Sequence, residues 1–208
     1  MQIICRGAES IIYLGEHEGK KVLVKERIRK GYRIKELDEK LRKQRTRREV
    51  KLLTEARKCG VLTPQVLHVD EKNHRIIMEF IEGERIKEFL NSASKKEIEK
   101  VCFEVGRLIG RLHSNRIVHG DLTTSNLILK DGKIYFIDFS LGGFSSRIED
   151  YGVDLNLLYE ALRSTHFKIL DVCWRKILEG YKKEFKQADR VIKKVEEIER
   201  RARYMKRK

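Results

Sequence analysis

The stretch HGDLTTSN, residues 119–126, holds the side chains on which the interpretation of the chain depends, and Asp138 follows twelve residues later in YFIDFS. Asp121 and Asn126 place an acid and an amide five residues apart, and Asp138 adds a second acid after an apolar run. Phosphoryl transfer uses such a set: one carboxylate orients or deprotonates the acceptor, while an amide and a second carboxylate hold Mg²⁺ on the nucleotide phosphates. A turn or cap would explain any one of these residues but not all three.

The pattern of the first 80 residues predicts an antiparallel sheet with one helix. Gly7 and the pair Glu18-Gly19 mark reversals between the first three strands, and a charged helix ends at a glycine stop after residue 58. Only the second half of that helix shows a buried pattern. The predicted strands cover 3–5, 11–15, 22–25, 65–69 and 75–80, and the helix covers 34–58.

The remainder of the chain predicts mainly helices. Ser94-Lys95-Lys96-Glu97 is a capping box, followed by apolar residues at helical spacing up to Leu112. Two short strands, 126–130 and 133–139, precede helices near 151–163, 167–186 and 188–205. The sequence therefore predicts an α+β fold of two lobes, with residues 1–80 as the first lobe, 81–84 as a hinge and 85–208 as a helical lobe with a basic tail. A ligand is expected between the lobes.

Charge is concentrated in two segments of this 208-residue chain, whose net charge is +15. Residues 29–58 hold 13 Lys and Arg against 5 Asp and Glu, and residues 189–208 hold 9 against 4. Solvated helix faces would account for part of this excess. Two concentrated basic segments favour a polyanionic partner, most plausibly RNA.

Several classes of protein are disfavoured by composition. Hydrophobic residues make up 40% and charged residues 38%, which is too apolar for a disordered chain. No run is long and apolar enough for a membrane span, and residues 1–10 do not look like a secretory signal. Four cysteines lie more than 40 residues apart, which disfavours a zinc pair or a disulfide framework. A cytoplasmic protein is expected.

HGDLTTSN and the IDF of residues 137–139 resemble the catalytic loop and metal-binding triplet of the protein-kinase superfamily. In this resemblance Asp121 is the catalytic aspartate that positions water or a serine hydroxyl. Asn126 and Asp138 are the Mg²⁺ ligands, and Lys25, at the end of the strand VLVK, contacts the ATP phosphates. Glu49 is the best helix partner for Lys25, because Leu52, Leu53 and Ala56 place it beside the buried face. Glu36, Glu39 and Glu55 have more charged surroundings.

Two further parts of the ATP site follow from the resemblance. Gly7-Ala8-Glu9-Ser10 takes the place of the glycine-rich phosphate loop, although it has one glycine where a typical kinase has three. Met78-Glu79-Phe80-Ile81 would be the hinge that offers backbone groups, at Glu79 and Ile81, to the adenine ring.

Departures from the kinase pattern indicate unusual regulation. Gly120 stands where regulated kinases have an arginine for a phosphorylated loop, and Ser140 replaces the glycine of the metal triplet. Only 16 residues separate Asp138 from Asp154, which resembles the buried aspartate of the next large helix. The segment on which substrate peptides normally lie is therefore expected to be missing.

The whole chain is similar to a narrower family, the small atypical kinases of the KEOPS (EKC) complex, also called the PRPK family. The motifs occur in the family's order, with slightly different spacing in the basic tail: RGAES, VKERIRKGYR, RTRREVKLL, HGDLTTSN, IDFSLG, VDL, and Arg200-Arg201-Ala202-Arg203 with Lys206-Arg207-Lys208. The resemblance implies an atypical serine/threonine kinase and ATPase that uses ATP and Mg²⁺. It also implies binding to the threonylcarbamoyl-transferase subunit and other subunits of KEOPS, in the modification of tRNA, which the basic segments would contact.

Two other functions remain open from the residues. Small-molecule phosphotransferases of the aminoglycoside or choline type also carry HGD and a following Asn, but their helical lobes usually add segments around an often acidic pocket. A pseudokinase or RNA-binding scaffold would bind nucleotide without hydrolysing it. The presence of all four expected catalytic and binding residues argues against this function: Lys25, Asp121, Asn126 and Asp138.

Overall fold

The computed structural model describes residues 2–205, with side chains up to Arg201. The strands are β1 (Gln2–Arg6), β2 (Ser10–His17), β3 (Lys20–Arg27), β4 (Val66–Asp70), β5 (Arg75–Glu79), β6 (Glu84–Arg85), β7 (Ile117–Val118), β8 (Leu127–Lys130), β9 (Lys133–Phe136) and β10 (Gly143–Phe144). The α-helices are α1 (Lys35–Lys58), α2 (Ile86–Ser92), α3 (Lys95–Ser114), α4 (Ile148–Thr165), α5 (Leu170–Glu184) and α6 (Ala188–Met205). The fold is mixed α+β, as predicted.

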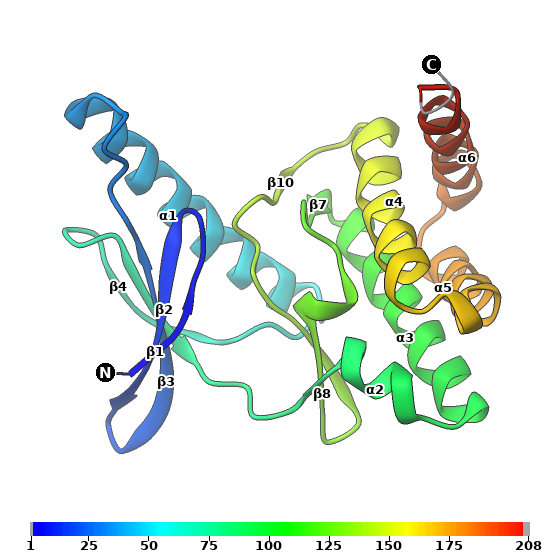
Figure 1. Ribbon diagram of the computed structural model, residues 1–208, viewed down its shortest axis with the longest axis horizontal. Helices are drawn as coiled ribbons and strands as arrows, with labels where there is room; N and C mark the ends of the chain where they lie inside the picture. Colours follow the sequence, from blue (N-terminus) through cyan, green and yellow to red (C-terminus); the bar gives the residue numbers. More distant parts are fainter. Residues whose placement is uncertain (1, 206–208) are drawn as a thin grey trace.

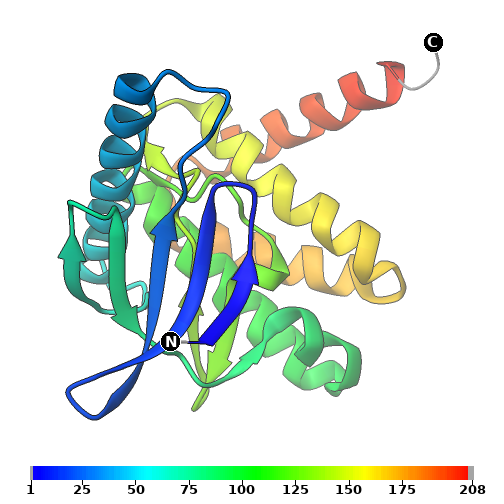
Figure 2. The same cartoon turned by 60° about the vertical axis from the view of Figure 1, so that its left-hand side comes forward.

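The N-terminal sheet has the strand order β1-β2-β3-β5-β4, and every neighbouring pair is antiparallel. Figures 1 and 2 show this sheet and α1 on one side of the molecule and the helices α2 to α6 on the other. The β2–β3 hairpin turns at Glu18 and Gly19, whose φ angles are 50° and 74°. Because β3 is the central strand, Lys25 lies between Ile12 of β2 and Ile76 of β5.

The predicted helices are confirmed, with small shifts at their ends. The Ser94 side chain caps the Glu97 N–H at 3.4 Å, and the Glu97 carboxylate accepts from the Ser94 N–H at 2.8 Å. Gly60 has a φ of 79°, as expected of a residue that ends a helix. The sequence patterns did not predict α2 or the two-residue strands β6, β7 and β10. These elements are too short for a helical or strand periodicity of apolar residues to be recognised.

Most of the N-terminal half of α1 is exposed or half-buried, as predicted, but Asp38 is an exception. Asp38 is fully buried because the Arg42 guanidinium donates to it at 2.7 Å and the Lys30 N–H at 3.1 Å. Burial would raise the pKa of Asp38, but these hydrogen bonds and the Arg42 and Arg33 charges hold it below the usual value. The buried side chain at position 38 is therefore a paired carboxylate, and a search for buried apolar residues does not detect it.

One hydrophobic core joins the elements around the site. Leu52 and Leu53 of α1 belong to the same buried cluster as the apolar faces of α3, α4 and α5. The helices α3 and α5 cross so closely that a Cβ on Gly106 would lie 1.9 Å from the Ile177 carbonyl oxygen, so only glycine fits. The lobe boundaries at residues 80 and 85 stay a prediction.

None of the helices within residues 2–205 is both long and apolar enough to cross a membrane.

Candidate active site

A buried ion pair connects the central strand to α1. Strand periodicity places Lys25 and Arg27 on the same face of β3, and both side chains point toward Glu49 of α1. Lys25 Nζ lies 2.7 Å from Glu49 Oε1, and an Arg27 guanidinium nitrogen lies 2.5 Å from Glu49 Oε2. All three residues are at most 4% exposed. Arg27 was not predicted, although its spacing of two from Lys25 is a signal that would have found it.

The same lysine also reaches the acid that follows β9. Lys25 Nζ lies 2.7 Å from Asp138 Oδ1 and 2.8 Å from Ser140 Oγ. Burial alone would lower the pKa of Lys25, but the charges of Glu49 and Asp138 raise it above its usual value. The structure therefore brings together three residues that the sequence separates by up to 113 positions.

Asp138 is held in an unusual backbone conformation with a φ of 62°. The Ser140 N–H donates to Asp138 Oδ1 at 3.2 Å, and the Ser140 hydroxyl donates to the same oxygen. Burial would raise the pKa of Asp138, but the Lys25 charge and hydrogen bond, with those of Ser140, lower it to about 2. The carboxylate is ionised at neutral pH, and its side chain is 37% exposed and so remains accessible to a ligand.

Asp121 and Asn126 form the second half of the site. Asn126 Nδ2 donates at 2.9 Å to the Asp121 carbonyl oxygen and at 2.9 Å to Asp121 Oδ2. The Asn126 carbonyl oxygen accepts from the Ile137 N–H at 2.9 Å, which joins this loop to the residue before Asp138. His119 adds a second link, since its Nε2 lies 3.0 Å from the Ile137 carbonyl oxygen.

The catalytic-loop backbone is fixed by Asp154 of α4. Its carboxylate accepts from the N–H groups of His119 and Gly120, both at 2.8 Å, and lies 3.2 Å from His113 Nε2. Gly120 has a φ of 80°, and a Cβ there would lie 2.3 Å from the Leu141 carbonyl oxygen. A side chain at this position would therefore clash with the backbone of Leu141 and Gly142.

The turn predicted to cover the phosphates is tied to its neighbours. The Gly7 N–H donates to the Ser10 carbonyl oxygen at 2.9 Å, and the Ala8 carbonyl oxygen accepts from Lys30. The Glu9 carboxylate is paired with Arg45 and, at 3.2 Å, with Arg33. The hydrogen bond from Arg45 is the largest of the effects that lower the pKa of Glu9. The Glu9 side chain thus bonds to arginines of α1 and the segment before it, and none of these contacts joins it to Lys25 or Asp138.

The predicted adenine strand lies at the end of β5. The Glu79 N–H donates to the Gln65 carbonyl oxygen at 2.9 Å. Ile81 is 5% exposed, and among the described residues its N–H donates no hydrogen bond. No hydrogen bond or ion pair among the described residues joins Glu79 or Ile81 to Lys25, whose partners are Glu49, Asp138 and Ser140, and their contact with a base stays a prediction.

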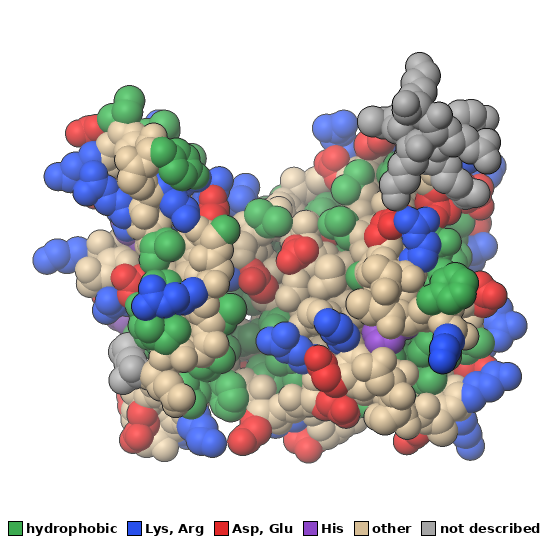
Figure 3. All heavy atoms as spheres, in the orientation of Figure 1, with side chains coloured by type: hydrophobic (Ala, Val, Ile, Leu, Met, Phe, Trp, Pro, Cys, Tyr) green, Lys and Arg blue, Asp and Glu red, His purple; other side chains and the backbone are tan. Residues whose placement is uncertain are grey.

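Several basic residues of the segment 29–58 pair with acids, either of α1 itself or of other elements. Arg47 is bound to Glu71 at 2.7 Å, and Arg42 to the buried Asp38. Figure 3 shows Lys and Arg side chains on the part of the surface formed by α1. Of the predicted tail, Lys206-Arg207-Lys208 and the side chain of Arg203 lie outside the described residues.

The donor set around Asp138 fits a magnesium ion that is shared with a nucleotide. Within the described part of the chain, no three His, Cys, Asp or Glu side chains form a metal cluster of their own. Mg²⁺ in nucleotide sites usually takes one or two protein oxygens and completes its shell with phosphates and water. The Asp138 carboxylate and the Asn126 side-chain oxygen provide such a pair.

Comparison with known proteins identifies the family of the chain. Residues 15–141 match the family model described as RIO1, RIO domain. A KEOPS complex subunit Bud32 from Pyrococcus abyssi is 51% identical over 100% of this chain and 98% of its own length. The chain belongs to the Bud32 family of RIO-domain proteins.

Other relatives of this family are longer. The chain is 45% identical to a probable bifunctional tRNA threonylcarbamoyladenosine biosynthesis protein from Methanothermobacter thermautotrophicus, covering 97% of this chain and 36% of that protein. The solved structure of WaaP in complex with acyl carrier protein has a TM-score of 0.72 at 14% identity, over 98% of this chain and 88% of that one. That likeness concerns the fold alone.

Proposed function

We propose that the protein is an ATP-dependent, kinase-type subunit of a KEOPS complex that takes part in forming threonylcarbamoyladenosine in tRNA. The observation that carries the enzymatic part is Lys25 Nζ, which lies 2.7 Å from both Glu49 Oε1 and Asp138 Oδ1. The biological part is supported by the relatives, one of which is named as a KEOPS subunit and another as a tRNA threonylcarbamoyladenosine biosynthesis protein.

In the proposed mechanism Lys25 contacts the nucleotide phosphates and Glu49 keeps its ammonium group in place. The Asp138 carboxylate and the Asn126 side-chain oxygen would hold a metal ion, whose charge would offset that of the phosphates. Glu79 and Ile81 offer backbone groups to the adenine ring, while the turn of Gly7, Ala8, Glu9 and Ser10 lies over the phosphates.

Asp121 is the residue proposed to act on the acceptor. Its carboxylate is oriented by Asn126 Nδ2 at 2.9 Å, so it is positioned to accept a hydrogen bond from a water molecule or a serine hydroxyl. With water as the acceptor the protein is an ATPase, and with serine or threonine it is an atypical protein kinase. The short connection from Asp138 to Asp154 favours hydrolysis, because it leaves little chain on which a substrate peptide could lie.

The direct test measures ATP binding and Mg²⁺-dependent ATP hydrolysis for the purified protein, alone and with the threonylcarbamoyl-transferase subunit of KEOPS plus tRNA. Asp138→Ala is expected to abolish metal-dependent nucleotide binding. Asp121→Ala is expected to keep binding and to lower turnover by about 100-fold or more. Full hydrolysis by Asp121→Ala would show that the role given to this residue is wrong, and binding without turnover in the wild type would favour a scaffold.

A further inference from the structure

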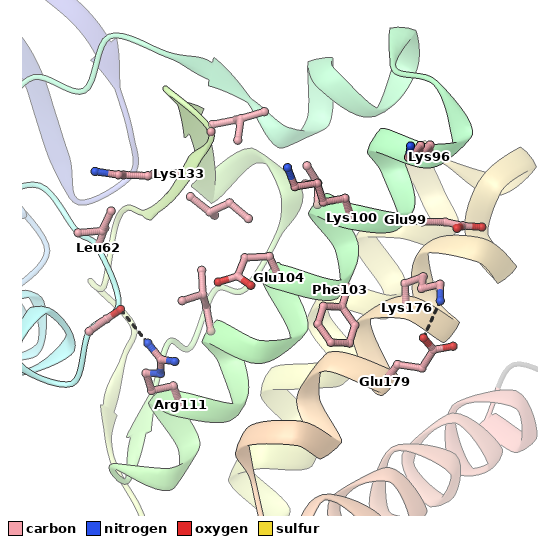
Figure 4. Close-up of a pocket in the computed structure, with 16 residues that line it drawn as sticks. Leu62, Lys96, Glu99, Lys100, Phe103, Glu104, Arg111, Lys133, Lys176 and Glu179 are labelled. Carbon is pink, nitrogen blue, oxygen red and sulfur yellow. Dashed lines mark hydrogen bonds and ion pairs between the residues drawn. The ribbon is translucent and has the colours of Figure 1, made fainter.

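One hollow of the molecule shares no residue with the candidate active site. It has a volume of about 620 Å³ and is bounded by α3, α5, the β8–β9 hairpin and the segment that follows α1. Figure 4 shows the lining side chains of these four elements around it. We call it the α3–hairpin groove. Its volume lies in the range of roughly 300–1,000 Å³ that is common for ligand sites.

The floor of the groove is apolar. Leu108 and Ile134 form its buried part, at 6% and 4% exposure. Val101, Phe103 and Leu129 line it as partly exposed side chains. Covering these side chains with another apolar surface is favourable by about 25 cal/mol for each Å² removed from water.

The carboxylates that line the groove already have basic partners. Glu179 is paired with Lys176 at 2.7 Å. Glu104 is paired at 3.1 Å with Arg107, and Glu99 lies 4.0 Å from Arg175. These acids are therefore balanced, and the charge left at the groove comes from lysines.

Three lysines of the groove form no side-chain hydrogen bond or ion pair within the part of the chain that the structure describes. Lys96 and Lys100 are four residues apart on α3 and so lie on the same face of the helix. Lys133 follows the tight turn at Asp131 and Gly132, whose φ angles are 50° and 70°. All three are exposed, so the groove offers three free ammonium groups beside an apolar floor.

We propose that the α3–hairpin groove is a docking site for a segment of a partner protein that combines apolar side chains with Asp and Glu. The free lysines come from both a helix and a hairpin, so a ligand that contacts all three must extend across the groove. A peptide does this and also carries apolar side chains for the floor, whereas RNA has no such side chains. The proposal goes beyond the nucleotide site and does not depend on it.

The test uses fluorescein-labelled twelve-residue peptides and measures binding by fluorescence anisotropy. The probe has leucines spaced among Asp and Glu. One control peptide replaces the leucines with serine, and another replaces the acids with lysine. The acidic, leucine-containing peptide is expected to bind the full chain at least tenfold more tightly than either control. Equal binding of the serine control would overturn the proposal, because charge alone would then explain the interaction.

Variants locate the binding. Lys100→Glu with Lys133→Glu is expected to weaken binding at least tenfold, whereas the matched pair Lys40→Glu with Lys43→Glu, on the exposed surface of α1, is expected to change it less than twofold. Val101→Trp places a larger side chain on the floor of the groove and is expected to weaken peptide binding at least tenfold. The thermal unfolding midpoint of this variant is measured to show that the fold is kept. An equal loss from the α1 pair would overturn the assignment.

The nucleotide separates this proposal from the proposed function. Saturating Mg²⁺-ATP is expected to change the Kd of the peptide by less than twofold. The Asp138→Ala variant is expected to bind the peptide with the same Kd as the wild type. Displacement of the peptide by Mg²⁺-ATP would place it in the nucleotide site and overturn the proposal. Absence of ATP hydrolysis would count against the proposed function alone.

Discussion

Two aspartates of this protein, Asp138 and Asp154, occupy neighbouring networks and differ in the balance of their partners. Asp138 is bound to the side chains of Lys25 and Ser140 and to one backbone N–H, that of Ser140, and its own side chain is 37% exposed. Asp154 is 1% exposed and accepts from two backbone N–H groups and from His113. The pKa of both carboxyls is lowered against the effect of burial.

The difference shows that one aspartate is suited to bind a ligand and the other to hold the backbone of the site. Partners on flexible side chains, such as the Lys25 ammonium, can move toward a phosphate or metal ion when a ligand arrives. Backbone N–H groups cannot leave without moving the chain, so Asp154 holds the shape of the loop that carries Asp121. The lowered pKa alone does not distinguish the two roles, but the type of partner and the exposure do.

The largest expected effect is that of Asp154→Ala on stability. The substitution leaves the His119 and Gly120 N–H groups and His113 without their acceptor in a buried place, which costs about 3–5 kcal/mol. Urea unfolding followed by circular dichroism measures the change. A variant as stable as the wild type would show that Asp154 does not hold the loop.

Gly120→Ala tests the same loop through its backbone. The positive φ costs an alanine about 1–2 kcal/mol, and the Leu141 carbonyl oxygen must also move away. The free energy of unfolding is expected to fall by at least about 2 kcal/mol. Gly132→Ala, which has a φ of 70° but open space around its Cβ, is the control and is expected to lose less.

Asp138→Asn is expected to have a smaller effect that depends on pH. Because the folded-state pKa is about 2, below the usual 3.8, the carboxylate stabilises the fold above about pH 4, and this contribution is lost as the pH falls toward 2. Solvent screening at a partly exposed group limits it to about 1–2 kcal/mol. Urea titrations of both proteins between pH 2 and 6 are expected to converge at the acidic end. A constant difference over this range would contradict the ion pair.

Ser140→Ala is expected to have the smallest effect. The Ser140 hydroxyl bonds to both Lys25 and Asp138, so it would compete with phosphate and metal for these groups. Its removal is expected to tighten Mg²⁺-ATP binding by about two- to tenfold, which corresponds to one hydrogen bond. Calorimetric titration measures this change. Weaker binding would show instead that the hydroxyl positions Asp138 for the ligand.

The order of strands and helices was predictable because most of them are long enough to show a period. The five strands before residue 81, the long helix with Glu49 and the capping box at Ser94 all occur where the patterns place them. The two-residue strands and α2 were not predictable, since a period cannot be seen over so few residues.

The candidate site was predicted as a set of residues but not as a network. The motif order indicated Lys25, Glu49 and Asp138, and the structure places them in contact. Sequence spacing gave no sign that Ser140 would bridge Lys25 and Asp138, or that Asp38 would be buried. Ser140 reaches Lys25, which lies 115 residues away, and Asp38 accepts from the Lys30 N–H, which lies 8 residues away outside the helix. The local partners Asp138 and Arg42 alone would not indicate either contact.

Gly106, at the crossing of α3 and α5, limits how far these two helices can move relative to each other. Where backbones touch, no side chain can change rotamer to absorb a displacement, so the two helices keep a fixed distance at Gly106. Both helices also form walls of the α3–hairpin groove. A segment that docks there would meet walls that are already in place, so little conformational entropy would be lost by the protein. Amide hydrogens on either side of this crossing should be among the slowest of the chain to exchange with deuterium.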